Sequence, residues 1–404
     1  MDFIENFIKI KKDYMKITVV TDVVTRRAGG VFNAVRDMFT SQIFSTQHIE
    51  ILSYQDDFVD KDISSWKNLP MKLFKPHFFL YSKNLRDTLC GMSMDIYHQE
   101  GLWRYSHLLM GKVRKRSNVP IVCTPHGMLD PYIIRAQGPI KRVISNLFFQ
   151  KSFEAVTCYQ ALCQKEMEDI RAYGLKQPIA IIPNGINLPD TSKRYSRKDN
   201  LRHLLFLGRL HHKKGVDLLL RAFSNVLRAN KSIASNWHID LVGWDHENCK
   251  RQLQKIVTDN DIDKYVTFHG GLYGDDKMRM YATCDAYILP SHGEGLPMTV
   301  LEAWSWRKPV LITPHCHLPE GYDVHAAIYI EDNVESIQKG LEKLFCMNED
   351  EMKEMGNNGF RLVESNFTWD VSAKKLLQTY NWLLGRIDKP DFIYEYEFCN
   401  ENYE

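Results

Sequence analysis

Apolar segments and helix-like segments alternate along most of this chain, and one polar stretch interrupts the alternation. Residues 16–21, KITVVT, are β-branched and apolar, as in a parallel strand that is buried on both faces. Residues 187–200 contain LPDTSKRYSRKD, which is typical of a linker, and the alternation resumes after them. Strands that alternate with helices predict a parallel sheet covered by helices on both faces. The sequence therefore predicts an α/β chain with two Rossmann-like, doubly wound domains.

The length supports two domains, because 404 residues exceed what one hydrophobic core usually serves. We expect a first domain over residues 1–190 and a second over 200–369. The first has strand candidates at 16–21, 49–54, 94–98, 120–125, 155–159 and 178–183, and helical patterns at 101–113, 140–152 and 161–173. The second has strand candidates at 203–209, 238–243, 265–270, 286–290 and 309–313, and helical patterns at 215–229, 248–257, 276–284, 297–306, 334–345, 349–364 and 371–384.

Composition excludes several classes of protein. The hydrophobic share of 44% and the charged share of 25% are those of a globular chain, not of a disordered or collagen-like one. No apolar run approaches the roughly 18 residues of a membrane-spanning helix. The nine cysteines include no Cys-x2-Cys pair, which indicates free thiols in a reducing compartment and no zinc site. The start of the chain lacks the layout of a secretory leader, so we expect a cytoplasmic location.

Positive charge gathers in one part of the first domain. Residues 101–151 contain nine basic residues and a single acid, Asp130, and Lys141 and Arg142 stand close to Leu147 and Phe148. A helix of this composition can lie on an anionic membrane surface, which would make the protein peripheral on the inner face of the cell membrane. The alternative is a solvated helix face whose aromatic residues fill the core. No nucleic acid is expected, because no known binding motif accompanies the basic residues.

The segment PSHGEGLPMTVLE follows a predicted strand and contains the most specific site residues. Glu294 lies in the loop after the strand, and Glu302, separated from it by seven residues, lies about one turn into a helix. The backbone amides of residues 298–300 open that helix and predict an anion site. Gly295 would allow a ligand to approach the backbone closely. Carboxylates beside an anion site can accept hydrogen bonds from sugar hydroxyls; the alternative is a solvated acidic loop.

Two cations follow the first strand of the second domain. In FLGRLHHKKG, Arg209 and Lys214 lie just beyond the strand, with Lys213 as the substitute if the register differs by one residue. A guanidinium fork and an ammonium point charge together can neutralise a diphosphate. They are less well explained as surface cations, because positive charge is disfavoured at the start of a helix.

The first domain offers weaker candidates. Gly29 and Gly30 precede a helical segment, where they indicate either a site of close approach or a simple turn. His126 in TPHGMLDP follows a predicted strand and could hold a substrate hydroxyl, act as an acid or base, or be structural. The PNGIN segment at 183–187 follows the last strand of this domain.

Taken in order, these segments resemble family 4 of the retaining glycosyltransferases, which have the GT-B fold. The resemblance rests on the Gly29–Gly30 loop, His126–Gly127, PNGIN, GRLHHKKG, the LVG strand end, and Glu294 with Glu302 ahead of a helix. It covers residues from about 16 to 385. It implies two Rossmann-like domains that face a central cleft, with the last helix, in 370–404, returning to the amino-terminal, acceptor-binding domain.

The resemblance also implies roles for individual residues. The donor would be a nucleotide-diphosphate sugar, bound by Gly29, Gly30, Arg209, Lys214, Gly243, Gly270, Glu294, Gly295, Leu296, Met298, Thr299 and Glu302. Arg209 and Lys214 would bind its diphosphate, Glu302 the ribose hydroxyls and Glu294 the transferred sugar. His126 would sit beside the sugar and the acceptor. His126, Arg209, Lys214 and Glu294 form the expected catalytic set.

The expected activity is a hexosyltransferase-like transfer with retained anomeric configuration. The acceptor would be a glycan or a lipid-linked saccharide, and the process cell-surface polysaccharide biosynthesis. Family members need no essential metal, and no further cofactor is expected. The alternatives are a nucleotide-sugar epimerase, a sugar phosphorylase, or an inactive partner that binds a sugar nucleotide. The chain departs from the family in EGLPMTVLE, which lacks the common Gly-Phe-Gly, and at Asn187, where Asp is frequent.

Overall fold

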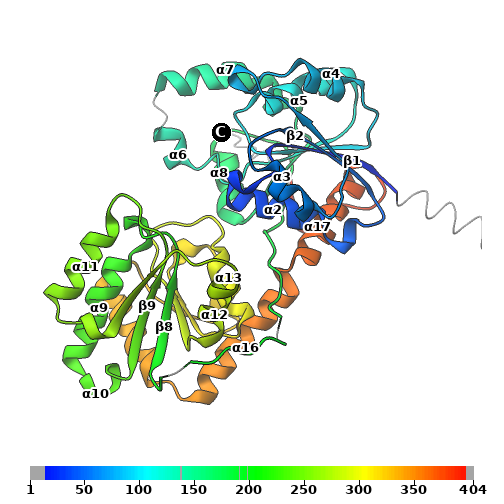
Figure 1. Ribbon diagram of the computed structural model, residues 1–404. Coiled ribbons are helices and arrows are strands. Elements are labelled where there is room, and N and C mark those ends of the chain that lie inside the picture. Colours follow the sequence, from blue (N-terminus) through cyan, green and yellow to red (C-terminus); the bar gives the residue numbers. More distant parts are fainter. Residues whose placement is uncertain (1–13, 137–138, 191, 198, 397–404) are drawn as a thin grey trace, which may run out of the picture. The chain divides into compact units, whose positions relative to one another are not determined.

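The computed structural model describes residues 14–136, 139–190, 192–197 and 199–396, without the side chains of residues 79 and 136–146. The start of the chain and the side chains of Lys141 and Arg142 therefore lie outside the described part. The chain forms two compact units (Figure 1). Unit 1 comprises Met1–Gly185 and Trp369–Glu404, and unit 2 comprises Ile186–Thr368. The change of unit between Gly185 and Ile186 precedes the whole polar stretch that the sequence assigns to a linker, which therefore belongs to unit 2.

Unit 1 contains an eight-stranded sheet in the order β14-β7-β6-β5-β4-β1-β2-β3. All neighbouring strands are parallel except β14 and β7, which pair antiparallel. The order reverses between β1 and β4, which lie side by side. The strands are β1 (Lys16–Val23), β2 (His48–Tyr54), β3 (Met71–Phe74), β4 (Ile96–Glu100), β5 (Ile121–Thr124), β6 (Cys158–Ala161), β7 (Ile179–Ile181) and β14 (Ile393–Tyr394).

Unit 2 contains a parallel six-stranded sheet in the order β10-β9-β8-β11-β12-β13. Here the order reverses between β8 and β11. In Figure 1, α9 and α11 lie on one side of β8 and β9, and α12 and α13 lie on the other. The strands are β8 (Arg202–Leu207), β9 (Trp237–Val242), β10 (Val266–Gly270), β11 (Ala286–Leu289), β12 (Val310–Ile312) and β13 (Ala327–Tyr329).

Helices connect the strands, so the predicted α/β fold with two doubly wound sheets is confirmed. The helices of unit 1 are α2 (Gly30–Phe39), α3 (Val59–Asp62), α4 (Lys83–Gly91), α5 (Tyr105–Arg116), α6 (Pro131–Ala136), α7 (Pro139–Ala155), α8 (Gln164–Ala172) and α17 (Trp369–Leu383). Those of unit 2 are α9 (Val216–Ala229), α10 (Lys231–Ala234), α11 (Cys249–Asp259), α12 (Gly274–Thr283), α13 (Met298–Ser305), α14 (Glu320–Asp323), α15 (Val334–Cys346) and α16 (Glu349–Asn366). Short 3-10 helices include η2 (Gln42–Phe44) and η5 (His212–Lys214).

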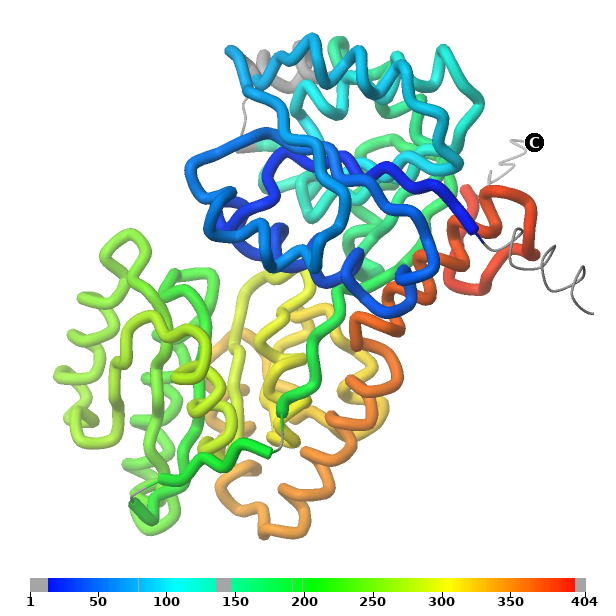
Figure 2. Tube along the Cα trace, turned by 45° about the vertical axis from the view of Figure 1, so that its right-hand side comes forward, coloured from blue at the N-terminus to red at the C-terminus, as the bar shows by residue number. Residues whose placement is uncertain are grey.

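The last helix returns to the amino-terminal unit, as the resemblance implies. Figure 2 shows α17, in orange-red, beside the blue segment that contains α2 and η2, and α17 contacts both. Its buried residues Ala373, Leu376 and Tyr380 belong to the same core as residues of β1 and α2. The Ser41 hydroxyl also donates to Asp370 at 2.7 Å. Burial of the apolar stripe thus fixes the carboxyl-terminal helix on unit 1.

Candidate functional site

The predicted donor-site residues of unit 2 come from the loops after β8 and β11. These two strands are neighbours at the point where the strand order of the sheet reverses. Loops at the carboxyl ends of such strands diverge to opposite faces of the sheet, which is why ligands of open α/β sheets bind there. The fold therefore places GRLHHKKG and PSHGEGLP at the favoured position.

Lys214 and Glu294 contact one another directly. The Lys214 ammonium donates to Oε1 and Oε2 of Glu294, at 2.6 and 2.8 Å. The two side chains are 19% and 11% exposed, so the pair is mostly shielded but accessible to a ligand. The Glu294 backbone N–H donates to the carbonyl of His315 at 3.0 Å, which fixes the loop. Lys214, rather than Lys213, is the lysine that meets this carboxylate.

The two loops pack too closely for a side chain between them. A Cβ on Gly215, whose φ is +64°, would lie 2.0 Å from the carbonyl oxygen of Pro290. The backbone N–H of His292 donates to the carbonyl of Lys213 at 2.8 Å. Glycine after Lys214 is therefore required both by the left-handed backbone and by the close approach.

Arg209 lies on the same loop, two residues after β8. Its side chain is exposed, and within the described part of the chain its guanidinium forms no ion pair. Gly243 lies beside this loop at the end of β9: a Cβ there would lie 1.7 Å from the carbonyl oxygen of Gly208. The Gly243 N–H donates to the carbonyl of Gly270, whose φ is +73°. Gly243 thus lets the ends of β8 and β9 approach one another closely, and the left-handed backbone at Gly270 favours glycine at the end of β10.

Glu302 is held by two residues of α12 that the sequence did not indicate. Lys277 donates to Oε1 at 2.5 Å, and the Tyr281 hydroxyl donates to Oε2 at 2.8 Å. Burial, followed by the Glu302 charge, raises the pKa of Tyr281 well above its usual value, so the hydroxyl remains a donor. Lys277 and Tyr281 stand one helical turn apart, but nothing in the sequence distinguishes this pair from a solvated one.

The start of α13 offers fewer free amides than the sequence predicts. The Val300 N–H is taken by the carbonyl of Pro297 at 3.0 Å, so residues 298–300 do not all face a ligand. Pro297 itself is the cap before the helix. The Thr299 hydroxyl accepts a hydrogen bond from Tyr287 at 2.7 Å. The amides of Met298 and Thr299 remain as candidates for the predicted anion site; Gly295, which precedes them, is exposed, and Leu296 is half-buried.

In unit 1, Gly29 and Gly30 open α2 directly after β1 and a short 3-10 turn. Gly29 has φ +58° and ψ −126°, a conformation that disfavours other residues. A Cβ at Gly30 would meet no atom within 4 Å, so packing inside unit 1 does not require glycine there. The open space at Gly30 is compatible with close approach of a ligand.

His126 belongs to a buried polar chain at the carboxyl ends of β4 and β5. Its Nε2–H donates to Oε2 of Glu100 at 2.6 Å, and Oε1 of Glu100 lies 3.2 Å from Nε2 of His98. Nδ1 of His98 lies 2.6 Å from the hydroxyl of Tyr380 on α17. Glu100 and His98 were not predicted from the sequence, although the period of two along YHQE places both on one face of β4.

The charged groups in this buried row of polar side chains stabilise one another. Burial alone would raise the pKa of Glu100, but the charges and hydrogen bonds of His98 and His126 hold that pKa at about 2. Burial alone would lower the pKa of His126, but the Glu100 carboxylate raises it above the ordinary value. His126 also has φ +54°, a strained conformation for a histidine. The Glu100 carboxylate therefore favours the protonated form of His126, in which the ring is a hydrogen-bond donor.

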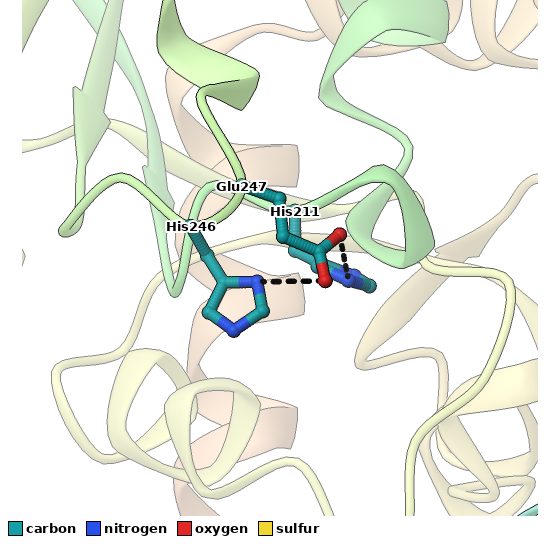
Figure 3. Close-up of side chains that lie close together, drawn as sticks. All are labelled: His211, His246 and Glu247. Carbon is teal, nitrogen blue, oxygen red and sulfur yellow. Dashed lines mark ion pairs between the residues drawn. The ribbon is translucent and has the colours of Figure 1, made fainter. Parts of the chain in front are cut away.

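Figure 3 shows a second cluster, in which the Glu247 carboxylate lies between the rings of His211 and His246. Its oxygens lie 3.5 Å from Nε2 of His211 and 3.8 Å from Nδ1 of His246. The Lys213 backbone N–H donates to Nδ1 of His211 at 3.2 Å, so neutral His211 carries its hydrogen on Nε2. A metal ligand must offer a lone pair there. His211, as placed, does not fit a metal ion held with the other two.

The basic region of unit 1 includes α7. Leu147 and Phe148 on this helix are 73% and 69% exposed, so these two side chains do not fill the core. Tyr132 on α6 is 61% exposed. Within the described residues, no helix combines the length and the apolar character needed to cross a membrane.

Comparison with known families covers both units. The model described as "Glycosyl transferases group 1" matches residues 189–362, and the model described as "Glycosyltransferase Family 4" matches residues 50–189. Among curated relatives, an uncharacterised glycosyltransferase of Methanocaldococcus jannaschii is 25% identical over 218 residues, which are 50% of this chain and 53% of the relative. The chain thus spans about half the length of that relative.

A further curated relative and a solved structure extend over more of the chain. The α-monoglucosyldiacylglycerol synthase of Streptococcus pneumoniae is 23% identical over 330 residues, which are 74% of this chain and 70% of that enzyme. The structure of Anabaena HepE in complex with UDP and glucose superposes with a TM-score of 0.65 at 15% identity, covering 91% of this chain and all of HepE (100%). At this identity, the superposition concerns the fold alone.

Proposed function

The chain belongs to the group 1, family 4 glycosyltransferases of GT-B fold, and from this we propose that it transfers a sugar from a nucleotide-diphosphate sugar to a saccharide or lipid-linked saccharide, with retained anomeric configuration. The observation that carries the proposal is the Lys214–Glu294 pair, which joins the loops after β8 and β11 at the point where the strand order of unit 2 reverses.

The cations would act on the leaving group. Negative charge develops on the departing nucleoside diphosphate as the sugar bond breaks, and preorganised cations and amides stabilise that charge without reorganisation. Arg209, Lys214 and the amides of Met298 and Thr299 would supply this stabilisation, and we also assign Gly30 to the donor diphosphate. Glu294 orients Lys214 and would contact the transferred sugar. The phosphate oxygen would accept the proton of the acceptor, so no separate base is assigned, and no metal is needed to balance the charge.

The remaining donor contacts follow from the polar residues of each unit. Glu302, with both oxygens held from α12, would accept hydrogen bonds from the ribose hydroxyls. The nucleotide base would lie against the turn at Gly243 and the loop at 269–272. His126, whose protonated form is favoured by Glu100, would donate a hydrogen bond to the transferred sugar.

We further propose that the protein binds an anionic membrane surface through the basic region of unit 1, and that its product belongs to a cell-surface polysaccharide. The exposed Leu147 and Phe148 on α7 support membrane contact, because basic residues with apolar neighbours bind anionic interfaces. One relative is named for a reaction on a diacylglycerol lipid. Sedimentation with anionic and with neutral vesicles tests this part; equal binding to both would contradict it.

The experiment that tests the activity is nucleoside diphosphate release from a panel of UDP-, GDP- and dTDP-sugars, with and without saccharide and lipid-linked acceptors. Release that requires an acceptor is expected. NMR of the product then gives the anomeric configuration, and an inverted product would contradict retention. Release that depends on phosphate would indicate a phosphorylase, and epimerisation without an acceptor would indicate an epimerase. Binding without turnover of any donor would indicate an inactive partner.

A further inference from the structure

Unit 1 contains a buried carboxylate that the function proposed above does not use. Glu166 lies in the first turn of α8 and is 5% exposed. Removing a carboxylate from water is costly unless hydrogen bonds replace those to water. The burial of Glu166 therefore has to be explained by the groups that its two oxygens bind.

The two oxygens of Glu166 bind the loops after two neighbouring strands, β5 and β6. Oε2 accepts the N–H of Leu162, just after β6, at 2.7 Å. An acid in the first turn of a helix commonly binds the backbone that precedes the helix, so capping of α8 accounts for this contact. Oε1 accepts the N–H of Gly127, beyond β5 and 39 positions earlier in the chain, at 2.6 Å. Capping does not account for the second contact.

The turn that Glu166 contacts is strained. His126 has φ +54° and Gly127 has φ +73°, so two consecutive residues have left-handed backbone. A strained turn persists only where the surrounding contacts hold it. Here the His126 ring is bound by Glu100, and the Gly127 backbone is bound by Glu166. Each carboxylate thus restrains one end of the segment that carries the imidazole.

The contacts also favour the ionised form of Glu166. Burial raises the pKa of Glu166, while the N–H groups of Gly127 and Leu162 and the charge of His126 oppose the rise. Both oxygens accept hydrogen bonds, which is the pattern of an ionised carboxylate. Hydrogen bonds from N–H groups to a charged oxygen are stronger than those between neutral groups. Glu166 is therefore suited to fix the backbone of the turn.

We propose that Glu166 is a positioning residue, which holds the N–H of Gly127 and thereby keeps the imidazole of His126 in place for the transferred sugar. The role of His126 toward the sugar rests on the function proposed above; the hold on the turn does not. The alternative is that Glu166 only caps α8. Its loss would then weaken the helix without releasing the His126 ring.

The test uses the full chain and two variants of Glu166. Glu166→Gln keeps the shape of the side chain but offers one acceptor oxygen in place of two. Glu166→Asp keeps the charge but is one methylene shorter, so it cannot reach both N–H groups; it is also the second variant if Glu166→Gln does not fold. The matched control is Glu168→Gln, at an exposed position of the same helix, where the carboxylate accepts only from Gln164.

The first readout is independent of turnover. NMR of protein labelled with [15N]histidine measures how fast the Nε2–H of His126 exchanges with water, and the signal missing from His126→Gln identifies this ring. We expect exchange at least tenfold faster in Glu166→Gln and in Glu166→Asp than in the wild type and Glu168→Gln. Unchanged exchange in Glu166→Gln would overturn the proposal. Wild-type exchange in Glu166→Asp would also overturn it, because charge without the two-point contact would then suffice.

The second readout is acceptor-dependent release of nucleoside diphosphate, with thermal shift in UDP and GDP to monitor the fold and the donor site. We expect kcat to fall at least tenfold in both Glu166 variants, while the donor KM and the thermal shift stay within twofold of the wild type. Full turnover in a variant with a loosened ring would overturn the positioning role. If the wild type releases no nucleoside diphosphate from any donor, the proposed function fails, and the exchange of the His126 ring still decides whether Glu166 holds the turn.

Discussion

The ammonium of Lys214 donates to both carboxylate oxygens of Glu294, 80 positions further along the chain. The contact joins the loop after β8 to the loop after β11, and Gly215 permits the close packing of these loops. A lysine held in this way keeps a defined position before a ligand arrives. A preorganised charge of this kind stabilises a leaving diphosphate more than a mobile surface lysine does, because the protein need not reorganise when the diphosphate departs.

Replacing either partner of this pair should remove most turnover. We expect Lys214→Ala and Glu294→Ala each to lower kcat by about 10²–10³, the range for loss of one preorganised donor. Steady-state kinetics and thermal unfolding measure the effect and confirm the fold. Lys339→Ala and Glu335→Ala are the matched controls, since this pair lies 2.7 Å apart on exposed α15 and should contribute little. Near-normal turnover in a site variant would remove that residue from the proposed site.

Substitution of Glu302 should weaken donor binding more than it slows chemistry. Glu302→Ala removes the acceptor proposed for the ribose hydroxyls, and Lys277→Ala removes one of the two partners that orient the carboxylate. We expect the donor KM to rise about tenfold in each, with kcat changing less, as for loss of binding that the ground and transition states share. Glu320→Ala, at an exposed position of the same unit, should leave both constants unchanged. A fall in kcat at constant KM would assign Glu302 to the chemical step instead.

The fold was largely predictable because its main signal is local. Continuous β-branched runs mark the buried parallel strands, and each predicted strand has a counterpart in the structure. The short strands β3, β13 and β14 escaped prediction. Met71–Phe74 and Ala327–Tyr329 carry only three or four residues each. Ile393–Tyr394 pairs with Ala180 and Ile179, more than 200 positions away, and no local sequence pattern predicts such a partner.

The candidate site was predictable only where a motif surrounds the residue. Lys214 and Glu294 stand in such segments, and the structure brings them together. Lys277 reaches Glu302 from a neighbouring helix, so its position depends on tertiary packing. The predicted row of free amides was too long, because the carbonyl of Pro297 turns back onto Val300.

Removal of the Glu100 charge should change the titration of His126. Because the Glu100 carboxylate raises the pKa of His126, we expect Glu100→Gln to lower that pKa, measured by NMR of the imidazole. The raised pKa implies stability that is full below about pH 6.5, the unfolded value, and is lost as pH rises through the folded value. Glu100→Gln should therefore flatten the stability profile on the alkaline side. Glu154→Gln, on the exposed face of α7, should change neither quantity; an unaltered His126 titration in Glu100→Gln would contradict the pairing.

His107 on α5 is fully buried against Phe149 and Phe153, with ring centroids 5.4 and 5.0 Å away. Neither of its nitrogens has a hydrogen-bond partner in the described part of the chain. Burial lowers its pKa to about 3, so the ring is neutral in the folded protein. The unfolded chain binds a proton below about pH 6.5, and the protein therefore loses stability as pH falls from that value toward 3.

We expect His107→Leu, of similar volume, to stabilise the protein at neutral pH by about 1–3 kcal/mol, because it removes two unsatisfied buried polar atoms. The free energy of unfolding of His107→Leu should also fall less steeply than that of the wild type as pH is lowered from about 6.5 toward 3. The difference between the two proteins should reach on the order of 5 kcal/mol over this pH range, since each unit of pKa shift is worth about 1.4 kcal/mol. Urea unfolding at several pH values from 7 to 4 measures both effects. His48→Leu, on β2, is the control for loss of a histidine. An acid profile of His107→Leu that parallels the wild type would show that His107 is protonated, and partnered, in the folded state.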